Sequence, residues 1–526
     1  MRLSQKGQVT MTKQTLVQGT LLLILAGLIT RILGFVNRIV MARVMGHEGV
    51  GLYMMAVPTF LLAVTLTRLG LPIAISKLVA EADATGDRSK VRKILIVSLA
   101  ITGVLSFVIT IGLFIAAPLL AEHFFTDDRT IWPLLAIAPV VPVVAVSSVL
   151  RGYFQGLQNM RPSAYSQVIE QVVRIALVAL LTGLFLPYGV HFAAAGAMIS
   201  VIIGELASLL YMFSMFKIKK KMRIRKGFFK QLKQGHQTLK DLLNIALPTT
   251  GSQLIGSVSY FFEPIVVANS LAIAGVTTAV ATAQYGELAG YVIPLLFLPT
   301  FITYSLSVSL VPAISEANAQ KKYHLIEHRL NQALKLSMLS GGIAVVILYV
   351  FAVPIMDLMY NSPASASYVK IMTPFFFFLY FQGPLQAVLQ ALDLARSAMI
   401  NSLIGALVKL SAIFALATRP EFGIMGAALA IVISIVVVTL LHFATVIKAI
   451  SYTVVVKDFA YSLFSIFITG AGAVYLYRFM MPKFPPVQGL AICVIATCGI
   501  YLFTLIFFRL LGKDDLKHIP VIKRWV

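Results

Sequence analysis

Residues 427–441 read AALAIVISIVVVTLL and contain no charged side chain. Apolar runs of this kind recur along the chain, for example at 16–32 and 94–117. A helix crosses a bilayer with about 20 predominantly apolar residues, whereas a membrane-spanning strand needs about half that number. The chain is therefore predicted to be an all-α, polytopic membrane protein.

The composition supports a membrane protein rather than a soluble one. Of the 526 residues, 59% are hydrophobic and 12% are charged, whereas soluble domains carry about 25% charged residues. The net charge of +23 could indicate a nucleic-acid partner. However, the basic residues gather in short loops between apolar runs, as in membrane proteins that are oriented by positive charge. Cys493 and Cys498 share the last run and suggest neither a disulfide nor a metal site.

Splitting the apolar runs at polar breaks predicts about fourteen spans. They are 16–42, 50–76, 94–117, 130–157, 163–186, 190–216, 241–272, 284–314, 332–353, 367–391, 397–418, 423–447, 458–480 and 486–508. Loops after even-numbered spans are basic, and Arg151 and Arg161 are counted among these loop charges. Loops after odd-numbered spans carry almost no Lys or Arg. The even loops and both termini are therefore predicted to be cytoplasmic. The first run has no cleavage site after it, so it is expected to remain as a helix.

A weak internal repeat suggests two lobes. Residues 155–157 (QGL) recur as 390–392 (QAL), and Arg174 then corresponds to Lys409. Two parallel repeats are typical of transporters with a site between the lobes. The predicted domains are a cytoplasmic N-terminus (1–15), a six-helix lobe (16–216), a basic cytoplasmic linker (217–240), a second six-helix lobe (241–450), and two additional helices with a basic tail (451–526).

Charged residues within the predicted spans are the candidates for function, because a charge at mid-bilayer costs about 2.5 to 3.5 kcal/mol even on the lenient insertion scale. The candidates for substrate binding are Arg31, Arg38, Arg68, Arg174 and Lys409, and the candidates for ion coupling are Glu170, Glu205 and Glu263. Five basic residues against three acidic ones favour an anionic cargo.

The first span places two arginines on one helical stripe with two glycines. Gly27, Arg31, Gly34 and Arg38 follow the spacing i, i+4, i+7, i+11, which is one face of a helix. That face could admit a bulky anion. Arg38, near the end of the span, could instead reach the membrane interface. Arg68 lies between two prolines, where loosened backbone often lines a cavity.

The other charged candidates could have either a structural or a functional role. Glu170 and Arg174 are spaced i, i+4, which favours a structural ion pair. Lys409 has no acid beside it in sequence, and an unpaired lysine in a membrane indicates function. Glu263 could carry a coupling cation or balance a cavity arginine. The stripe Gln382, Gln386 and Gln390 suits hydrogen bonding between helices, although sugar hydroxyls would also fit it.

Nothing in the sequence indicates an enzyme, a metal or a cofactor. The eight histidines are scattered, no acidic pair lies near a nucleophile, and no glycine-rich phosphate loop opens a helix. The lack of a nucleotide-binding motif also argues against ATP as a built-in energy source.

Several segments resemble a known transporter family. They are 30–38 (TRILGFVNR), 49–53 (GVGLY), 151–156 (RGYFQG), 167–171 (QVIEQ), 248–252 (PTTGS) and 383–390 (GPLQAVLQ). They are similar to the polysaccharide-transporter branch of the multidrug/oligosaccharidyl-lipid/polysaccharide (MOP) flippase superfamily, and most similar to the stage V sporulation protein B family. Related lipid II flippases have an arginine-rich cavity for pyrophosphate, and Arg31 matches one of its arginines. Asn37 and Arg38 depart from that pattern, since the family has an arginine and an acid there.

The resemblance implies a transporter that flips an undecaprenyl-pyrophosphate-linked glycan by alternating access, for synthesis of the spore cortex. Its partners would be the lipid-linked substrate, membrane lipid and cell-wall synthesis enzymes, with no nucleic acid. Its location would be the cell membrane, including the membranes around the forespore. The alternatives are a cation-coupled multidrug exporter, a non-transporting scaffold for cell-wall enzymes, and a glycan polymerase. An exporter of cationic drugs would favour acidic cavities, and a polymerase would need a large outer loop.

Overall fold

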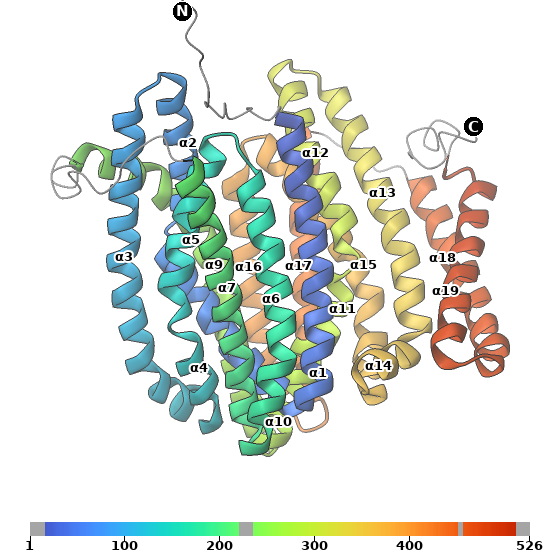
Figure 1. Cartoon of the computed structure of the whole chain (residues 1–526). Helices are drawn as coiled ribbons and strands as arrows, with labels where there is room; N and C mark the ends of the chain where they lie inside the picture. The colour runs from blue at the N-terminus through green and yellow to red at the C-terminus, as the bar shows by residue number, and fades with distance from the viewer. Residues whose placement is uncertain (1–15, 220–234, 451–455, 512–526) are drawn as a thin grey trace, which may run out of the picture. The chain divides into compact units, whose positions relative to one another are not determined.

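The computed structural model describes residues 16–219, 235–450 and 456–511 (Figure 1). Within these ranges every regular element is a helix and no strand occurs. The prediction of an all-α fold is therefore confirmed. The middle of the basic linker, residues 220–234, lies outside the described part of the chain, as do both basic ends.

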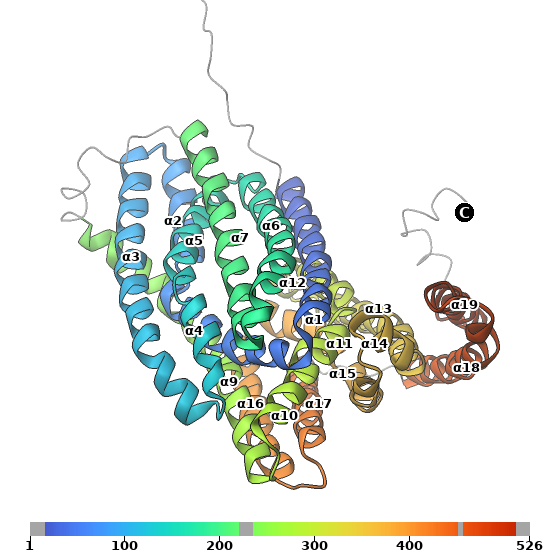
Figure 2. The ribbon, with the colours of Figure 1, turned by 60° about the horizontal axis from the view of Figure 1, so that its bottom comes forward.

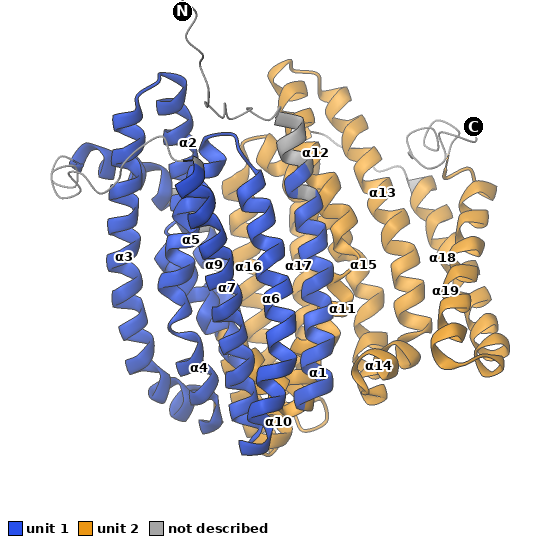
Figure 3. Cartoon of the chain, in the orientation of Figure 1, with its two compact units in different colours: residues 1–45, 55–124, 128–261 blue, residues 46–54, 125–127, 262–526 orange. Residues whose placement is uncertain are grey.

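The chain divides into two compact units, which Figure 3 shows in different colours. Unit 1 comprises Met1–Met45, Met55–Phe124 and Asp128–Phe261, and unit 2 comprises Gly46–Met54, Phe125–Asp127 and Phe262–Val526. Two short segments from the N-terminal half, one of them inside the first long helix, thus belong to unit 2. The predicted lobe boundaries at 216 and 241 remain a prediction.

Unit 1 is built mainly from long helices with short connections. Its helices are α1 (Leu16–Arg68, apart from 46–54), α2 (Leu71–Ala84), α3 (Arg88–Leu119), η1 (Leu120–Phe124), η2 (Asp128–Thr130), α4 (Ile131–Ile137), α5 (Val140–Gly156), α6 (Arg161–Phe185), η3 (Leu186–Tyr188), α7 (Val190–Lys219) and the first part of α9 (His236–Ile273). Its core gathers apolar residues of α2, α3, α5 and α7, among them Ile75, Ile94, Phe154 and Met212, all almost fully buried.

Unit 2 contains the remaining helices. They are the end of α9, α10 (Thr278–Tyr285), η4 (Gly286–Val292), α11 (Ile293–Phe297), α12 (Thr300–Ala319), α13 (Tyr323–Val350), α14 (Ala352–Tyr360), η5 (Pro363–Ser365), α15 (Ala366–Ala391), α16 (Ala395–Ala417), α17 (Ile424–Ile450), α18 (Val456–Met480), η6 (Met481–Lys483) and α19 (Pro486–Phe507). Helix α15 packs against α12, α13 and α17, and Leu330, Leu385 and Leu389 are buried where these helices meet.

The last two helices, α18 and α19, lie side by side (Figures 1 and 2). Tyr501 of α19 donates a hydrogen bond to the carbonyl oxygen of Leu339 on α13, at 2.9 Å. A Cβ atom on Gly342 of α13 would lie 2.5 Å from the Tyr501 hydroxyl. Glycine at this position therefore makes room for the tyrosine that ties α19 to α13.

Helix α1 is broken at Gly46, which has φ 67° and ψ −171°. Only glycine adopts this conformation readily, so the long helix consists of two arms. These arms correspond to the first two predicted spans, 16–42 and 50–76.

The number of spans agrees with the sequence analysis once breaks are considered. The described residues contain 12 helices long and apolar enough to cross a membrane, or 13 if the pair 278–297 and 300–319, bent by 54°, counts as one span. The first of these candidate spans is 60 residues long, Leu25–Ala84, and it includes the break at Gly46. Counting its two arms separately brings the number to the predicted fourteen.

Candidate functional site

Two glycines on α5 position Arg151 inside unit 1. A Cβ atom on Gly152 would lie 2.8 Å from the Pro72 carbonyl oxygen, and one on Gly156 would lie 2.7 Å from the Ser76 carbonyl oxygen. The glycine face of α5 therefore packs directly on the backbone of α2. Arg151 itself reaches toward α6 and α7, and its side chain is only 18% exposed.

A third glycine brings two carboxylates together. A Cβ atom on Gly204 of α7 would lie 2.9 Å from the carbonyl oxygen of Glu170 on α6, so the two helices approach closely here. Glu205 follows Gly204 in the chain, and both Glu170 and Glu205 are buried. Buried carboxylates need cationic or hydrogen-bonding partners, because an isolated charge is strongly disfavoured in a medium of low polarity.

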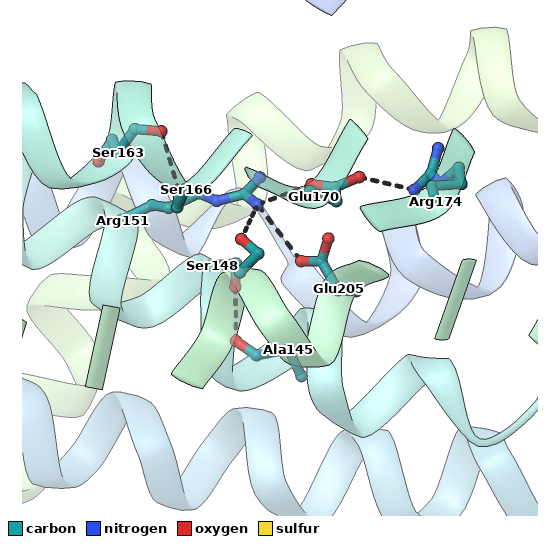
Figure 4. Close-up of polar contacts among 9 residues, drawn as sticks. Ala145, Ser148, Arg151, Ser163, Ser166, Glu170, Arg174 and Glu205 are labelled. Carbon is teal, nitrogen blue, oxygen red and sulfur yellow. Dashed lines mark hydrogen bonds and ion pairs between the residues drawn. The ribbon is translucent and has the colours of Figure 1, made fainter. Parts of the chain in front are cut away.

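Arginines supply those partners, as Figure 4 shows. The Nη2 atom of Arg151 lies 3.2 Å from a carboxylate oxygen of Glu170 and 3.3 Å from one of Glu205. Arg174 lies one turn along α6 and pairs with the other Glu170 oxygen at 2.6 Å. The predicted Glu170–Arg174 pair therefore forms, and Arg151 connects it to Glu205. Arg151 also donates to the Ser208 hydroxyl at 3.3 Å.

Arg68, at the end of α1, joins this network electrostatically. It is close enough to Arg151, Glu205 and Glu170 to interact with their charges. Its Nε atom is buried and has no hydrogen-bond partner among the described residues. We call Arg68, Arg151, Arg174, Glu170 and Glu205 the unit 1 charge cluster. With three guanidinium groups and two carboxylates, it carries a formal excess of one positive charge.

The prediction that Arg151 is a loop residue is wrong. The residue lies within α5, five positions before the helix ends at Gly156. The signal that could have identified it is the apolar sequence that precedes it and the glycines that follow it, which favour a packed helix face over a loop.

Lys409 is paired in unit 2, contrary to its interpretation as an isolated charge. Its Nζ atom on α16 donates to a carboxylate oxygen of Glu263 on α9 at 2.5 Å. The two side chains are 17% and 7% exposed. Glu263 therefore balances a lysine and not the arginine that was considered for it, while its role in ion coupling stays a prediction.

The two arginines of the first arm of α1 lie in a different environment. Arg31 is exposed and Arg38 is half-buried, while Asn37 between them in sequence is buried. On the same stripe, a Cβ atom on Gly27 would meet nothing within 4 Å, whereas one on Gly34 would approach the Gln171 side chain at 4.0 Å. The glycine stripe is thus open at Gly27 and contacts α6 at Gly34.

The glutamine stripe of α15 acts in part as a link between helices. Gln382 donates to the Ile435 carbonyl oxygen at 2.9 Å and to the Thr439 hydroxyl at 3.0 Å, both on α17. Gln386 and Gln390 are exposed. In the described part of the chain, no cluster of three or more His, Cys, Asp or Glu side chains could hold a metal ion.

Two solved structures of known transport proteins share the fold of this chain. A MATE family transporter of the MOP superfamily in its inward-facing conformation aligns with a TM-score of 0.67 at 17% identity, over 80% of this chain and 94% of that one. The inward closed structure of the lipid II flippase MurJ aligns with a TM-score of 0.71 at 18% identity, over 94% and 99% of the two chains. The chain is a multi-pass membrane protein with the fold of these two transport proteins.

The family follows from sequence. Residues 16–317, more than half of the chain, match the family of polysaccharide biosynthesis proteins, and residues 264–414 match the MatE family. Stage V sporulation protein B of Bacillus subtilis (strain 168) is 59% identical over 98% of this chain and 100% of its own. The lipid II flippase MurJ of the same organism is 25% identical over 75% and 76% of the two chains. The chain belongs to the family of polysaccharide biosynthesis proteins and to the stage V sporulation protein B family.

Proposed function

We propose that the protein flips an undecaprenyl-pyrophosphate-linked glycan, a lipid II-like peptidoglycan precursor, across the cytoplasmic membrane for synthesis of the spore cortex. The observation that carries this proposal is the excess positive charge of the unit 1 charge cluster. A buried site with an excess of cations suits an anionic cargo, because a pyrophosphate offers oxygens that guanidinium groups can bind through two parallel hydrogen bonds.

The relatives support the cargo and its use. One is named a lipid II flippase, and the 59% identical one is named for a stage of sporulation. Both names describe those proteins, and we extend them to this chain together with the orientation that the basic loops predict. Both termini are then cytoplasmic, and the location includes the membranes around the forespore, where cell-wall synthesis enzymes would be partners.

We assign the basic residues to substrate contact according to how they are paired. Arg68 is the first candidate, because among the described residues its buried Nε atom has no hydrogen-bond partner and, unlike Arg151 and Arg174, no carboxylate lies within ion-pair distance of its guanidinium group. Arg31 and Arg38 follow, since they lie on the glycine-lined stripe. Arg174 and Lys409 are each held by a carboxylate, so they would reach a phosphate oxygen only when that carboxylate is neutralised.

This pairing suggests a role for the acidic residues. Protonation of Glu263 would free Lys409, and protonation of Glu170 or Glu205 would free an arginine of the unit 1 charge cluster. The three glutamates would then couple ion binding to capture of the anion. Such coupling supplies an energy source that does not need ATP.

The test is binding of lipid-linked muropeptide to the purified full chain in nanodiscs. Arg68→Ala should weaken binding about tenfold to a hundredfold, because hydrogen bonds to charged groups contribute about 1.5 to 3 kcal/mol. Arg68→Lys should retain part of the affinity. Arg478→Ala, which alters an exposed arginine near the end of α18, is the matched control and should bind as the wild type does.

Competitors separate the rival functions. The undecaprenyl alcohol tests simple capture of the lipid tail, and an organic dye cation tests the drug exporter that the MatE match would allow. Equal binding of the alcohol, or tighter binding of the dye, would refute the anionic cargo. In the native host, loss of the gene should leave spores deficient in cortex, and the Arg68→Ala chain should fail to restore it.

A further inference from the structure

The break in α1 places a histidine where two backbones touch within unit 2. His47 follows Gly46, whose φ of 67° interrupts the helix. A Cβ atom on Gly51 would lie 2.0 Å from the Thr282 carbonyl oxygen, and one on Gly286 would lie 2.3 Å from the His47 carbonyl oxygen. At Gly51 and Gly286 the backbone of residues 46–54 therefore lies directly against the backbone of α10 and η4.

The element on the other side is unusual. Helix η4, Gly286–Val292, has π-helical hydrogen bonding, a rare form that often marks functional positions. Glu287, in its first turn, lies with Oε1 3.1 Å from Nδ1 of His47. The Ser362 hydroxyl, donating at 3.5 Å, is a more distant partner of the same oxygen.

Both side chains of this pair are partly exposed, although the Nδ1 atom of His47 is itself buried. The His47 side chain is 39% exposed and that of Glu287 is 18% exposed. Among the described residues, Nδ1 of His47 has no hydrogen bond of good geometry, so its attraction to Glu287 depends on charge. Since histidine gains its charge between about pH 5 and 8, this contact depends on pH in a way that an Arg–Glu pair does not.

The other titratable groups near the pair are phenols and carboxyls. The Tyr291 ring lies 5.5 Å from His47 and stacks on Tyr360 at 4.7 Å, and Tyr368 is near Glu287. Phenols ordinarily titrate near pH 10 and carboxyls near pH 4. The carboxyls nearby are Glu48, next to His47 in the chain, and Asp127, which accepts a 2.7 Å hydrogen bond from Thr282.

We propose that His47 and Glu287 form a proton-binding site that clamps residues 46–54 to η4. With a proton on His47, the imidazolium and the carboxylate attract each other, and the segment is held. When the proton leaves, Glu287 loses its cationic partner and the segment can move at the Gly46 hinge. The clamp therefore forms above the ordinary carboxyl range, near pH 4, and is lost as pH rises through the histidine range, about pH 5 to 8.

The site differs in kind from the unit 1 charge cluster. It needs no lipid-linked substrate, and its ligand is the proton itself. It would make the conformation of α1 responsive to pH at the end of the helix arm where, according to the basic loops, the chain meets the outer side of the membrane.

Hydrogen–deuterium exchange of the full chain in nanodiscs tests the clamp. Exchange of the amides of residues 47–54 is compared at pH 5.5 and 8.5 after correction for intrinsic rates. In the wild type, the corrected rate should rise about twofold to fivefold at the higher pH, as expected for a partly exposed ion pair. His47→Lys keeps its charge at both pH values, so its rate should stay low and constant.

Two further variants complete the test. Glu287→Gln should exchange fast at both pH values, because no charge attracts the histidine. His191→Gln changes a histidine of unit 1 whose ring lies 6.2 Å from that of Trp132, and it should follow the wild type. Exchange in α13 reports whether each variant is folded. A wild type without pH dependence, or a His47→Lys variant with the wild-type profile, would overturn the proposal while leaving the flippase assignment untouched.

Discussion

The Lys409–Glu263 ion pair makes a quantitative prediction about stability. At 2.5 Å and an effective dielectric constant of about 20, the attraction between unit charges is about 7 kcal/mol. Loss of solvation offsets most of this. Removing one partner of a buried pair costs about 3 to 5 kcal/mol, whereas replacing both by apolar residues is about neutral.

Three variants separate these effects. Lys409→Met and Glu263→Leu should each lose about 3 to 5 kcal/mol of unfolding free energy, because each leaves an uncompensated buried charge. The double variant should lie within about 1 kcal/mol of the wild type, so the two changes are not additive.

The measurement is unfolding in mixed micelles by titration with a denaturing detergent, followed by circular dichroism. If the losses of the single variants add up in the double variant, the two side chains do not depend on each other and the reasoning fails. Transport by the double variant then assigns a role to the pair. Full flipping activity would make it purely structural, whereas a stable but inactive protein would support substrate contact by Lys409.

Three further predictions concern orientation, packing and substrate contact. The basic loops predict that Gln320 is cytoplasmic and that Glu421 lies on the outer side of the membrane. In a cysteine-free background, a cysteine at exposed position 320 should therefore resist an impermeant thiol reagent in intact cells, whereas one at exposed position 421 should react. Gly51→Ala should lower the melting temperature, since its Cβ would meet the Thr282 carbonyl oxygen, whereas Gly27→Ala, with nothing within 4 Å, should not. Arg31→Ala should abolish flipping at normal abundance in the membrane, and Arg31→Lys should restore part of it; full activity of the alanine variant would show that Arg31 is dispensable.

The helices could be predicted from sequence because hydropathy is a local property. Apolar runs of sufficient length identify the spans, and the spacing of Glu170 and Arg174 predicts an ion pair within a single helix. The hinge at Gly46 could not be predicted in the same way. Glycine occurs at many positions here, 35 in all, and only the packing of residues 46–54 shows which one breaks the helix.

The site residues were harder to predict because their partners are distant in sequence. Lys409 and Glu263 are 146 residues apart, so no local pattern could identify the pair. Arg151 lies near the end of an apolar run, where a charge ordinarily reaches the membrane interface, and its partners on α6 and α7 are visible only once the helices pack. The sequence therefore identified Glu170, Glu205 and Glu263 as candidates, but it did not identify Arg151 and Lys409 as their ion-pair partners.

Each unit contains segments from both halves of the chain, and this limits how the protein can be divided into fragments that fold. A cut within the basic linker would be expected to separate the two predicted lobes. However, the N-terminal fragment would keep residues 46–54 and 125–127, which belong to unit 2. The same cut would leave the first part of α9, which belongs to unit 1, on the C-terminal piece. Neither piece would hold a complete unit. Separately expressed halves should therefore regain a native fold only by assembling with each other, so a split version of the protein would report their association.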